Sequence, residues 1–357
     1  MSSVRMPRLA SARIRRYSEG ACALVAPAII LAVALLAGTG GAARQATIKA
    51  GLVSDVGRFN DKGFNQSQLV GLKRSRSLGG VTITGIESRS AGDYIPNFVT
   101  LARQHYDVII GAGFLLASQE NTVAKKFPSI HFAITDYSVH APPFADNKGV
   151  VKTTNVTGLT YATQENSYLV GCLAALMTKK DGAKHIISVT AGVKIPPVDA
   201  FAAGYRAGAA KCVPGTKTLI GYSQDFIAQD KCKAIAQNQI AAGSHVVFNV
   251  AGPCGLGALE AAKEQGVWGV GVDVDQAYLG PHILTSAVKR VDQGVYLTVK
   301  AAKDGTLVGG GDITFNLKNG GVALGKISPK VPAAFKAKLA ALQKQIVAGT
   351  IVPPAAL

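Results

Sequence analysis

The feature that most constrains this chain is a regular alternation of β-rich and helical segments, repeated in two series along its length. The first series runs from Thr47 to Asp136, and the second runs from Glu165 to Asp273. Strands and helices that alternate through short connections are typical of mainly parallel sheets covered by helices. The sequence therefore predicts an α/β chain with two Rossmann-like lobes.

The segments are recognised from β-branched apolar runs and from apolar residues at helical spacing. The predicted strands cover Thr47–Val53, Val81–Ser88, Val108–Gly111, His131–Thr135, Lys184–Ala191, Lys217–Tyr222, His245–Val250 and Val267–Val272. The predicted helices cover Asn65–Ser77, Tyr94–His105, Ser118–Lys126, Glu165–Thr178, Val198–Ala210, Gln229–Ala242 and Leu256–Gln265. With 357 residues, 48% of them hydrophobic, the chain is long enough for one core in each lobe.

The first 43 residues differ from the rest and follow the pattern of a secretory signal. An uncharged apolar run, Ala23–Gly38, follows five arginines and precedes a stretch of small residues that ends at Ala43. The alternative is a permanent membrane anchor, but the run is shorter than the roughly 20 residues that usually span a bilayer. We therefore expect residues 1–43 to be a signal segment and the protein to be exported.

The formal net charge of +17 raises the question of nucleic-acid binding. Cleavage near Ala43 removes five arginines and Glu19, which leaves a charge of about +13. The remaining lysines are scattered, and no basic run is interleaved with aromatic residues as in nucleic-acid binding surfaces. The sequence favours a solvated basic surface and predicts no nucleic-acid partner.

The cysteines bear on metal binding and on disulfides. Outside the signal segment they are Cys172, Cys212, Cys232 and Cys254, and no two of them form a CxxC pair, so a zinc site is not expected. An exported protein can form disulfides. Cys212 follows one predicted helix and Cys232 opens the next, which makes them a candidate pair. Cys172 lies on an apolar helical run and is expected to be a buried thiol.

Polar, glycine and aromatic residues follow nearly every predicted strand. They include Asp55, Asn60, Asp61, Phe64 and Asp136 in the first series, and Phe201, Phe226, Gly252 and Asp273 in the second. Taken singly, an aspartate there is usually a helix cap and a glycine a turn residue. Together they indicate a ligand site, because ligands of doubly wound sheets bind beyond the carboxyl ends of the strands.

The chain also resembles a known family in several ordered segments from about residue 47 to 330. These are SDVGRFNDKGFNQS, FAITDYSV, ENSYLVGCLAALMT, PPVDAFAAGYRAGA, GPCGLGALEAAKEQGVWGVGVDVDQ and ILTSAVKRVD. They are similar to the basic membrane protein family of substrate-binding lipoproteins, which includes the purine nucleoside receptor of ABC uptake systems. The resemblance implies a type I periplasmic-binding-protein fold with three hinge crossovers. It places residues 47–158 and about 275–315 in the first lobe, and 159–274 and about 316–357 in the second.

The same resemblance implies a closing cleft that holds a purine nucleoside. Phe64 and Phe226 would stack on opposite faces of the base, while Asp273 and Lys289 would hold the ribose. Asp55, Asp136 and either Asn60 or Asp61 would bind the base or order the first-lobe loop, and the alternative between the last two stays open. Gly252 would admit close backbone approach, and Phe201 would be a lesser contact.

One departure from the family concerns its lipid anchor. No lipidation motif follows the apolar run, since the Leu-Leu-Ala-Gly that ends it at residue 38 is followed by Thr39, and Cys22 precedes the run. The protein is therefore expected in the periplasm or the extracellular space, either free or tethered to the membrane.

Three functions are weighed against one another. The first is the substrate-binding component of an ABC importer, a monomer that presents its ligand to a membrane permease. The second is a binding protein for a sugar or another small polar solute, in uptake or in sensing. The third is a nucleoside-processing enzyme, which is disfavoured because no HExxH, GxSxG or P-loop motif is present. The sequence thus predicts a binding protein with no enzymatic activity, no cofactor and no metal.

Overall fold

The first lobe is built on a fully parallel six-stranded sheet of largely buried strands. The computed structural model describes residues 47–357, so the predicted signal segment lies outside the described residues. The strand order is β11-β5-β4-β3-β1-β2, with each neighbouring pair parallel. The strands are β1 (Ile48–Val53), β2 (Val81–Ile86), β3 (Val108–Gly111), β4 (His131–Thr135), β5 (Val156–Tyr161) and β11 (Asp312–Phe315).

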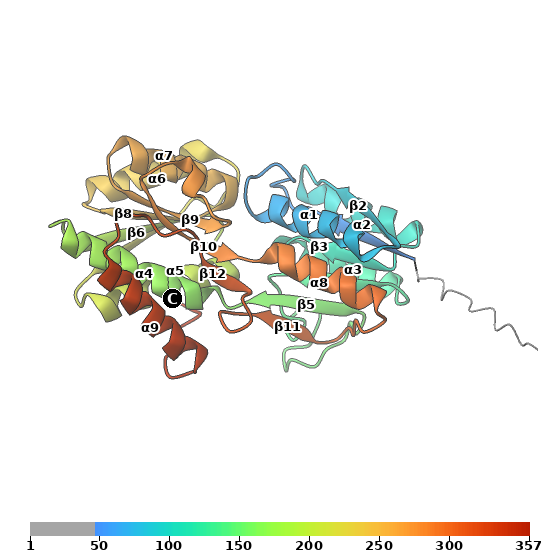
Figure 1. Ribbon diagram of the computed structural model, residues 1–357. Coiled ribbons are helices and arrows are strands. Elements are labelled where there is room, and N and C mark those ends of the chain that lie inside the picture. Colours follow the sequence, from blue (N-terminus) through green and yellow to red (C-terminus); the bar gives the residue numbers. More distant parts are fainter. Residues whose placement is uncertain (1–46) are drawn as a thin grey trace, which may run out of the picture. The chain divides into compact units, whose positions relative to one another are not determined.

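Helices cover this sheet on both faces, and two separate apolar clusters fill the space beneath them. The helices are α1 (Phe64–Arg74), α2 (Tyr94–Arg103), α3 (Ala117–Lys126) and α8 (Val291–Lys303), with short 3₁₀ turns η1 (Ser75–Leu78), η2 (Ala91–Asp93) and η3 (Phe114–Leu116). Figure 1 shows α8, drawn in orange, packed beside the blue α1 although more than 200 residues separate them.

The second lobe repeats this plan with the strand order β12-β10-β9-β8-β6-β7. Its strands are β6 (Ile186–Ala191), β7 (Lys217–Tyr222), β8 (Val246–Val250), β9 (Trp268–Asp273), β10 (Ile283–Lys289) and β12 (Val322–Leu324). Only the pairing of β12 with β10 is antiparallel within this sheet. The helices are α4 (Thr163–Lys180), α5 (Pro196–Cys212), α6 (Gln229–Ala241), α7 (Gly255–Glu264) and α9 (Ala333–Val347), with η4 (Gly252–Cys254) and η5 (Ala277–Leu279).

The chain crosses between the lobes three times, as predicted. The crossings follow β5 at Ala162, β10 at Arg290 and β11 at residues 316–321. They are joined to one another, because the Ala162 amide donates to the Phe315 carbonyl at 2.8 Å and the Arg290 amide donates to the Gly321 carbonyl at 2.9 Å. The two-lobed α/β fold is therefore confirmed.

The second crossing lies later in the chain than the sequence indicated. Residues from about 275 were assigned to the first lobe, but β10 pairs in parallel with β9 and so extends the second sheet. After β10 the chain returns to the first lobe, where α8 packs against α1. The assignment was wrong because strand pairing over a distance, and not the local pattern, decides which sheet receives a strand.

The disulfides also differ from the prediction. Cys172 bonds to Cys212 and Cys232 bonds to Cys254, with Cα–Cα distances of 5.1 and 5.6 Å. The predicted Cys212–Cys232 pair is wrong, because β7 runs between these residues along its full length. Its six residues cover about 20 Å at roughly 3.3 Å each, so the two cysteines lie near opposite ends of β7. Cys172 is buried as expected, but as a disulfide and not as a thiol.

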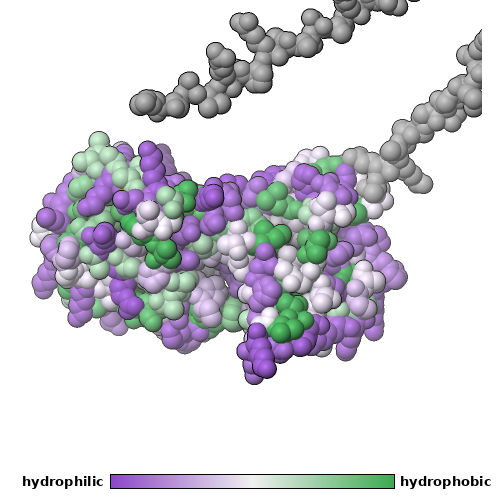
Figure 2. All heavy atoms as spheres, turned by 90° about the horizontal axis from the view of Figure 1, so that it is seen from below, coloured by the Kyte–Doolittle hydropathy of each residue, from purple (hydrophilic) through white to green (hydrophobic). Residues whose placement is uncertain are grey.

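The surface carries no single polar or apolar region on the face seen in Figure 2. Hydrophilic side chains are spread over it, with small hydrophobic areas among them. Among the helices of residues 47–357, none is long and apolar enough to cross a membrane.

Candidate functional site

A cleft lies where the carboxyl ends of the strands of both sheets meet. Its cavity volume is about 70 Å³, within about 630 Å³ of empty space that includes open solvent. Nine of the ten residues predicted from the sequence line it; they are Asp55, Asp61, Phe64, Asp136, Phe201, Phe226, Gly252, Asp273 and Lys289. Asp55, Asp61 and Asp136 lie in loops of the first lobe and Phe64 opens its helix α1, whereas the other five residues come from the second lobe.

The tenth residue, Asn60, is exposed and does not line the cleft. Its neighbour Asp61 is buried and caps the first turn of α1, which resolves the alternative left open by the sequence. The Asp61 carboxylate accepts hydrogen bonds from the backbone amides of Gly63, Asn65 and Gln66 at 2.8 to 3.0 Å. A carboxylate at a helix N-terminus satisfies amides that have no partner within the helix. Asp61 therefore orders the loop that carries Phe64.

Asn65 is a cleft residue that the sequence reasoning missed. Its side-chain amide donates to Asp55 Oδ1 at 2.7 Å and to Asp61 Oδ2 at 3.1 Å. Its Oδ1 atom is buried and has no hydrogen-bond partner among the described residues. A buried unpaired acceptor in a cleft is costly unless a ligand donates to it. The only sequence signal was its place in the DKGFNQS segment.

Asp55 lies beside Asn65 at the end of β1. Burial raises the pKa of the Asp55 carboxyl to about 6, although hydrogen bonds from the Gly57 amide and from Asn65 lower it. Asp61 and Asp136 also raise it through charge repulsion. The first-lobe wall of the cleft therefore carries a carboxyl group that is close to its protonation midpoint under mildly acidic conditions.

Lys289 and Asp136 form a buried ion pair between the two lobes. The Lys289 ammonium also lies 4.9 Å from the ring centroid of Phe64, 5.3 Å from that of Tyr161 and 5.7 Å from that of Phe201. Aromatic faces attract a cation through their quadrupole. The lysine is thus held by one carboxylate and three rings at the base of the cleft, near the crossings.

Asp273 ends β9 with a φ of +63°, in the left-handed region that a non-glycine residue seldom adopts. Its side chain is buried, and burial raises its pKa to about 7, opposed by the nearby charge of Lys289. No donor from residues 47–357 forms a hydrogen bond with this carboxylate. Its oxygens are therefore available to accept hydrogen bonds from a ligand.

Two phenylalanine rings face the cleft from opposite lobes, and each rests on a glycine. A Cβ atom on Gly113 would come within 3.0 Å of the Phe64 ring, and one on Gly192 within 2.3 Å of the Phe226 ring. Only glycine leaves room for the ring at these positions. Each ring therefore packs closely against glycine backbone while it also lines the cleft.

Further apolar lining completes the site, and the sequence reasoning did not select these residues for it. They are Leu115, Phe114, Ile195, Pro197, Val198, Val250, Pro253 and Val272. Phe114 packs on Tyr137 with ring centroids 4.7 Å apart. They lie at the carboxyl ends of β8 and β9 or in the segments that follow β3, β6 and β8, which is the signal that could have identified them. Phe201 also contacts the core, where its ring meets Phe248 edge-on at 6.1 Å.

Comparison with known proteins assigns this architecture to a family. The family of PnrA-like ABC transporter substrate-binding proteins, called Bmp, matches residues 48–355. The chain belongs to the Bmp family. Among the relatives of this Bmp-family protein, the ABC transporter nucleoside-binding protein BmpA of Lactococcus lactis is 33% identical over 89% of this chain and 92% of its own length. A basic membrane protein of Borrelia garinii is 30% identical over 84% of this chain and 86% of its own.

Solved structures agree on the fold of this Bmp-family protein. An ABC transporter solute-binding protein from Aeropyrum pernix matches with a TM-score of 0.76 and 24% identity, over 86% of this chain and 94% of that one. The Caulobacter myo-inositol binding protein matches with a TM-score of 0.57 and 14% identity, over 79% of this chain and 93% of that one. These similarities confirm the predicted periplasmic-binding-protein fold of type I.

Membership of the Bmp family confirms several expectations. The protein is a substrate-binding protein of an ABC transporter, a role that implies a ligand and a membrane permease as partners. The prediction that it is not an enzyme is confirmed, since the family is one of non-enzymatic binding proteins. The family acts outside the cytoplasm.

Proposed function

We propose that the protein binds a purine nucleoside in the cleft and delivers it to an ABC permease. The observation that carries this proposal is the pair of phenylalanine rings, Phe64 and Phe226, which line one cleft from opposite lobes and each pack against a glycine. A flat heteroaromatic base suits such a pair, because stacking on aromatic rings stabilises planar ligands. The name of the Lactococcus lactis relative, a nucleoside-binding protein, supports the same ligand class.

The polar groups of the cleft suit the rest of the nucleoside. Asp273 and Lys289 bind the ribose hydroxyls, with the ionised carboxylate accepting hydrogen bonds and the ammonium group donating one. Asn65 and Asp55 accept hydrogen bonds from N–H groups of the base, because the Asn65 Oδ1 atom has no partner within the described chain. Gly252, with φ +55°, lets the backbone approach the ligand closely.

Ligand binding across the lobes closes the cleft. Each lobe contributes two phenylalanine rings and at least one carboxylate to the lining. A ligand that bridges two lobes has more contacts in the closed form than in the open form, and it therefore shifts the population toward closure. The three hydrogen-bonded crossings are the segments about which the lobes move.

A thermal-shift screen tests the ligand class, because a ligand bound only by the folded protein raises its melting temperature. Purine nucleosides are expected to raise it, while free ribose, pentoses and hexoses at equal concentration are expected to leave it unchanged. A rise with sugars but not with nucleosides would replace the proposal with the sugar-binding alternative. Isothermal calorimetry with the best nucleoside should then give one site for each chain.

Export of the protein is the other part of the proposal. The mature protein acts in the periplasm or outside the cell, after removal of residues 1–43. Mass spectrometry of protein recovered from the native host measures where the chain begins. A start near Arg44 supports cleavage, whereas an intact N-terminus in the membrane fraction indicates that the segment is retained as a tether.

A further inference from the structure

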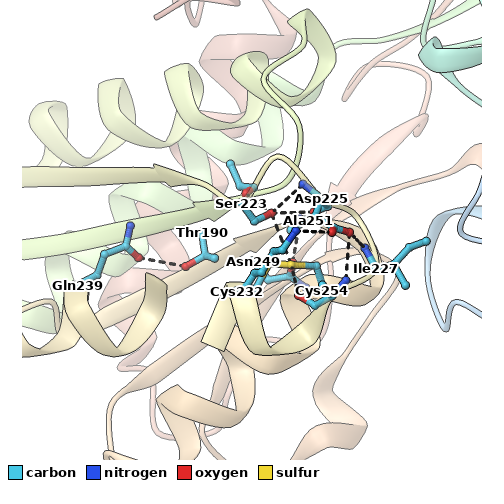
Figure 3. Close-up of a disulfide and its surroundings, with 12 residues drawn as sticks. Thr190, Ser223, Asp225, Ile227, Cys232, Gln239, Asn249, Ala251 and Cys254 are labelled. Atoms are coloured by element: carbon cyan, nitrogen blue, oxygen red, sulfur yellow. Dashed lines mark hydrogen bonds and ion pairs between the residues drawn. A yellow bond between two sulfur atoms is a disulfide. The ribbon is translucent and has the colours of Figure 1, made fainter. Parts of the chain in front are cut away.

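One disulfide lies directly behind the second-lobe wall of the cleft. Cys232 belongs to the first turn of α6, Cys254 ends η4, and both are fully buried. The segment before α6 carries Phe226, and η4 itself contains Gly252 and Pro253, all of which line the cleft. Figure 3 shows the bond with the polar network around it, including Ser223, Asp225 and Asn249.

The Phe226 segment follows an edge strand and therefore needs support from elsewhere. β7 is the last strand in the order β12-β10-β9-β8-β6-β7, so it has a neighbouring strand on one side only. The segment is half-buried, and Gln224 within it has a φ of +53°. A loop at the edge of a sheet has few neighbours to restrict it, so its conformation depends on local bonds.

The start of the segment is held at the end of β6, where the Ser223 and Gln224 amides donate to the Ala191 and Gly192 carbonyls at 2.8 and 3.1 Å, and its later part is held against η4. The Cys254 amide donates to the Phe226 carbonyl at 2.9 Å. The Asp225 carboxylate accepts from the amides of Ile227 at 2.8 Å and Ala228 at 3.1 Å, which fixes the turn that leads into α6. The disulfide is the covalent part of the same attachment.

The η4 side of the disulfide is anchored in the core of the lobe. β8, which precedes η4, is fully buried between β6 and β9. The buried Asn249 side chain accepts from the Ala251 amide at 3.0 Å, and it lies so close to Gly255 that a Cβ there would come within 1.5 Å of its Oδ1 atom. The disulfide therefore links the Phe226 segment, which follows an edge strand, to η4, which follows a buried central strand.

We propose that the Cys232–Cys254 disulfide positions Phe226 for ligand stacking, and this inference rests on the function proposed above. The bond keeps the ring over Gly192 in the empty protein, so that binding does not have to order it. Preorganised groups bind more tightly because less conformational freedom is lost on association. The cysteines touch no ligand and act through Phe226.

The second disulfide provides a matched control in the same lobe. Cys172 and Cys212 join α4 to the carboxyl-terminal end of α5, whereas the cleft residues Pro197 and Phe201 lie near its amino-terminal end. The two helices already pack closely, since a Cβ on Gly208 would come within 1.8 Å of the Tyr168 carbonyl oxygen. This bond therefore supports the lobe without reaching the cleft.

The test compares two double variants by calorimetry with the nucleoside that the wild-type protein binds best. Cys232→Ala/Cys254→Ala is expected to weaken binding about fivefold, which corresponds to the loss of order in one loop side chain. Cys172→Ala/Cys212→Ala is expected to change affinity less than about twofold, although both pairs lower the melting temperature. Equal affinity of the two double variants contradicts the proposal.

A double-mutant cycle separates positioning from general loosening of the lobe. In a Phe226→Ala background, removal of Cys232–Cys254 should lower affinity less than about twofold further, because the ring it positions is gone. In an Asp273→Asn background the same removal should still cost about fivefold. Additive losses in both backgrounds would refute the inference.

Two controls keep the outcomes distinct. If wild-type protein binds no nucleoside, the proposed function has failed and the cycle is repeated with whichever solute the thermal-shift screen identifies. If the double alanine variant does not fold, Cys232→Ala/Cys254→Val restores some of the lost volume, and the same affinity loss is expected of it.

Discussion

The ammonium group of Lys289 is paired with the carboxylate of Asp136, and this contact joins the end of β10 in the second lobe to the end of β4 in the first. Both side chains are buried. Their pairing across the base of the cleft links the stability of the protein with the geometry of its binding site.

Removal of the lysine charge should destabilise the protein. Lys289→Met leaves the Asp136 carboxylate buried without its counter-charge, and such losses cost about 3 kcal/mol or more in unfolding free energy. Lys300→Met is the control, since it breaks an exposed pair with Asp304 one helical turn away and should cost less than about 1 kcal/mol. Urea unfolding at pH 7 measures both, and equal losses would contradict the burial argument.

Truncation of the second-lobe ring should weaken nucleoside binding. Phe226→Ala removes one stacking surface and is expected to lower affinity at least about tenfold, or about 1.4 kcal/mol. Phe335→Ala, a half-buried phenylalanine of α9 outside the cleft, is the matched control and should leave affinity unchanged. Calorimetry measures the nucleoside affinity of both variants. An unaltered affinity of the Phe226 variant would show that this ring does not contact the ligand.

Nucleoside affinity should rise with pH through neutrality. Burial raises the pKa of Asp273 to about 7 in the empty cleft, and ligand hydroxyls donate to the ionised form. Protonation therefore competes with binding, and affinity should fall about tenfold between pH 8 and pH 6.

Two substitutions check this assignment. Asp273→Asn should weaken binding at pH 8 and flatten the pH profile, because the titrating carboxyl is gone. Asp275→Asn, which changes an exposed carboxyl two residues away, should keep the wild-type slope. A slope that persists in Asp273→Asn would assign the titration to another group.

Replacement of a buried acid in the first lobe should stabilise the protein. Glu120 is fully buried on α3, neither of its oxygens has a hydrogen-bond partner within the described chain, and burial raises its pKa well above the ordinary value. The unfolded chain releases this proton near pH 4.5, whereas the folded protein retains it to higher pH. The folded state therefore binds more protons, and stability falls as pH rises from 4.5 toward the folded-state pKa.

Glu120→Met removes this cost. It should raise the unfolding free energy at pH 7 by at least about 1.4 kcal/mol, equivalent to one pKa unit, with a much smaller gain at pH 4. Glu260→Met changes an exposed position on α7 and should alter the unfolding free energy by less than about 0.5 kcal/mol at both pH 7 and pH 4. Denaturant titrations at the two pH values measure the difference, and a gain that is equal at both would contradict the titration argument.

Much of the local structure could be predicted because its causes are local. Apolar runs at strand spacing and at helical spacing identify fifteen of the twenty-one strands and α-helices in residues 47–357, and the observed ends differ by a few residues at most. Parallel strands place their carboxyl ends at one edge, so residues such as Asp55, Phe226 and Asp273 could be grouped without knowledge of any distance. The sequence did not predict six elements, which lie nearest to the crossings or beyond the last of the repeated segments. They are β5, β10, β11, β12, α8 and α9.

Long-range pairing was decided by the tertiary structure alone. The lobe that receives β10 depends on which strand it bonds to, and the partner of Cys232 depends on which cysteine lies at the same edge of the sheet. The local sequence pattern predicts neither the strand partner nor the disulfide partner, because each depends on distances between residues far apart in the chain. The same holds for Asn65, whose unpaired oxygen is apparent only once Asp55 and Asp61 have taken its amide group.

The sequence by itself thus determined the two α/β lobes, which follow from periodicity, and nine of the twenty residues that line the cleft. Most of these nine follow from strand direction. The tertiary structure decided what those residues do for one another. Asp61 caps a helix, Lys289 pairs with Asp136, and Cys232–Cys254 ties the Phe226 segment to η4. These roles arise from burial and proximity, which exist only after the two sheets have formed.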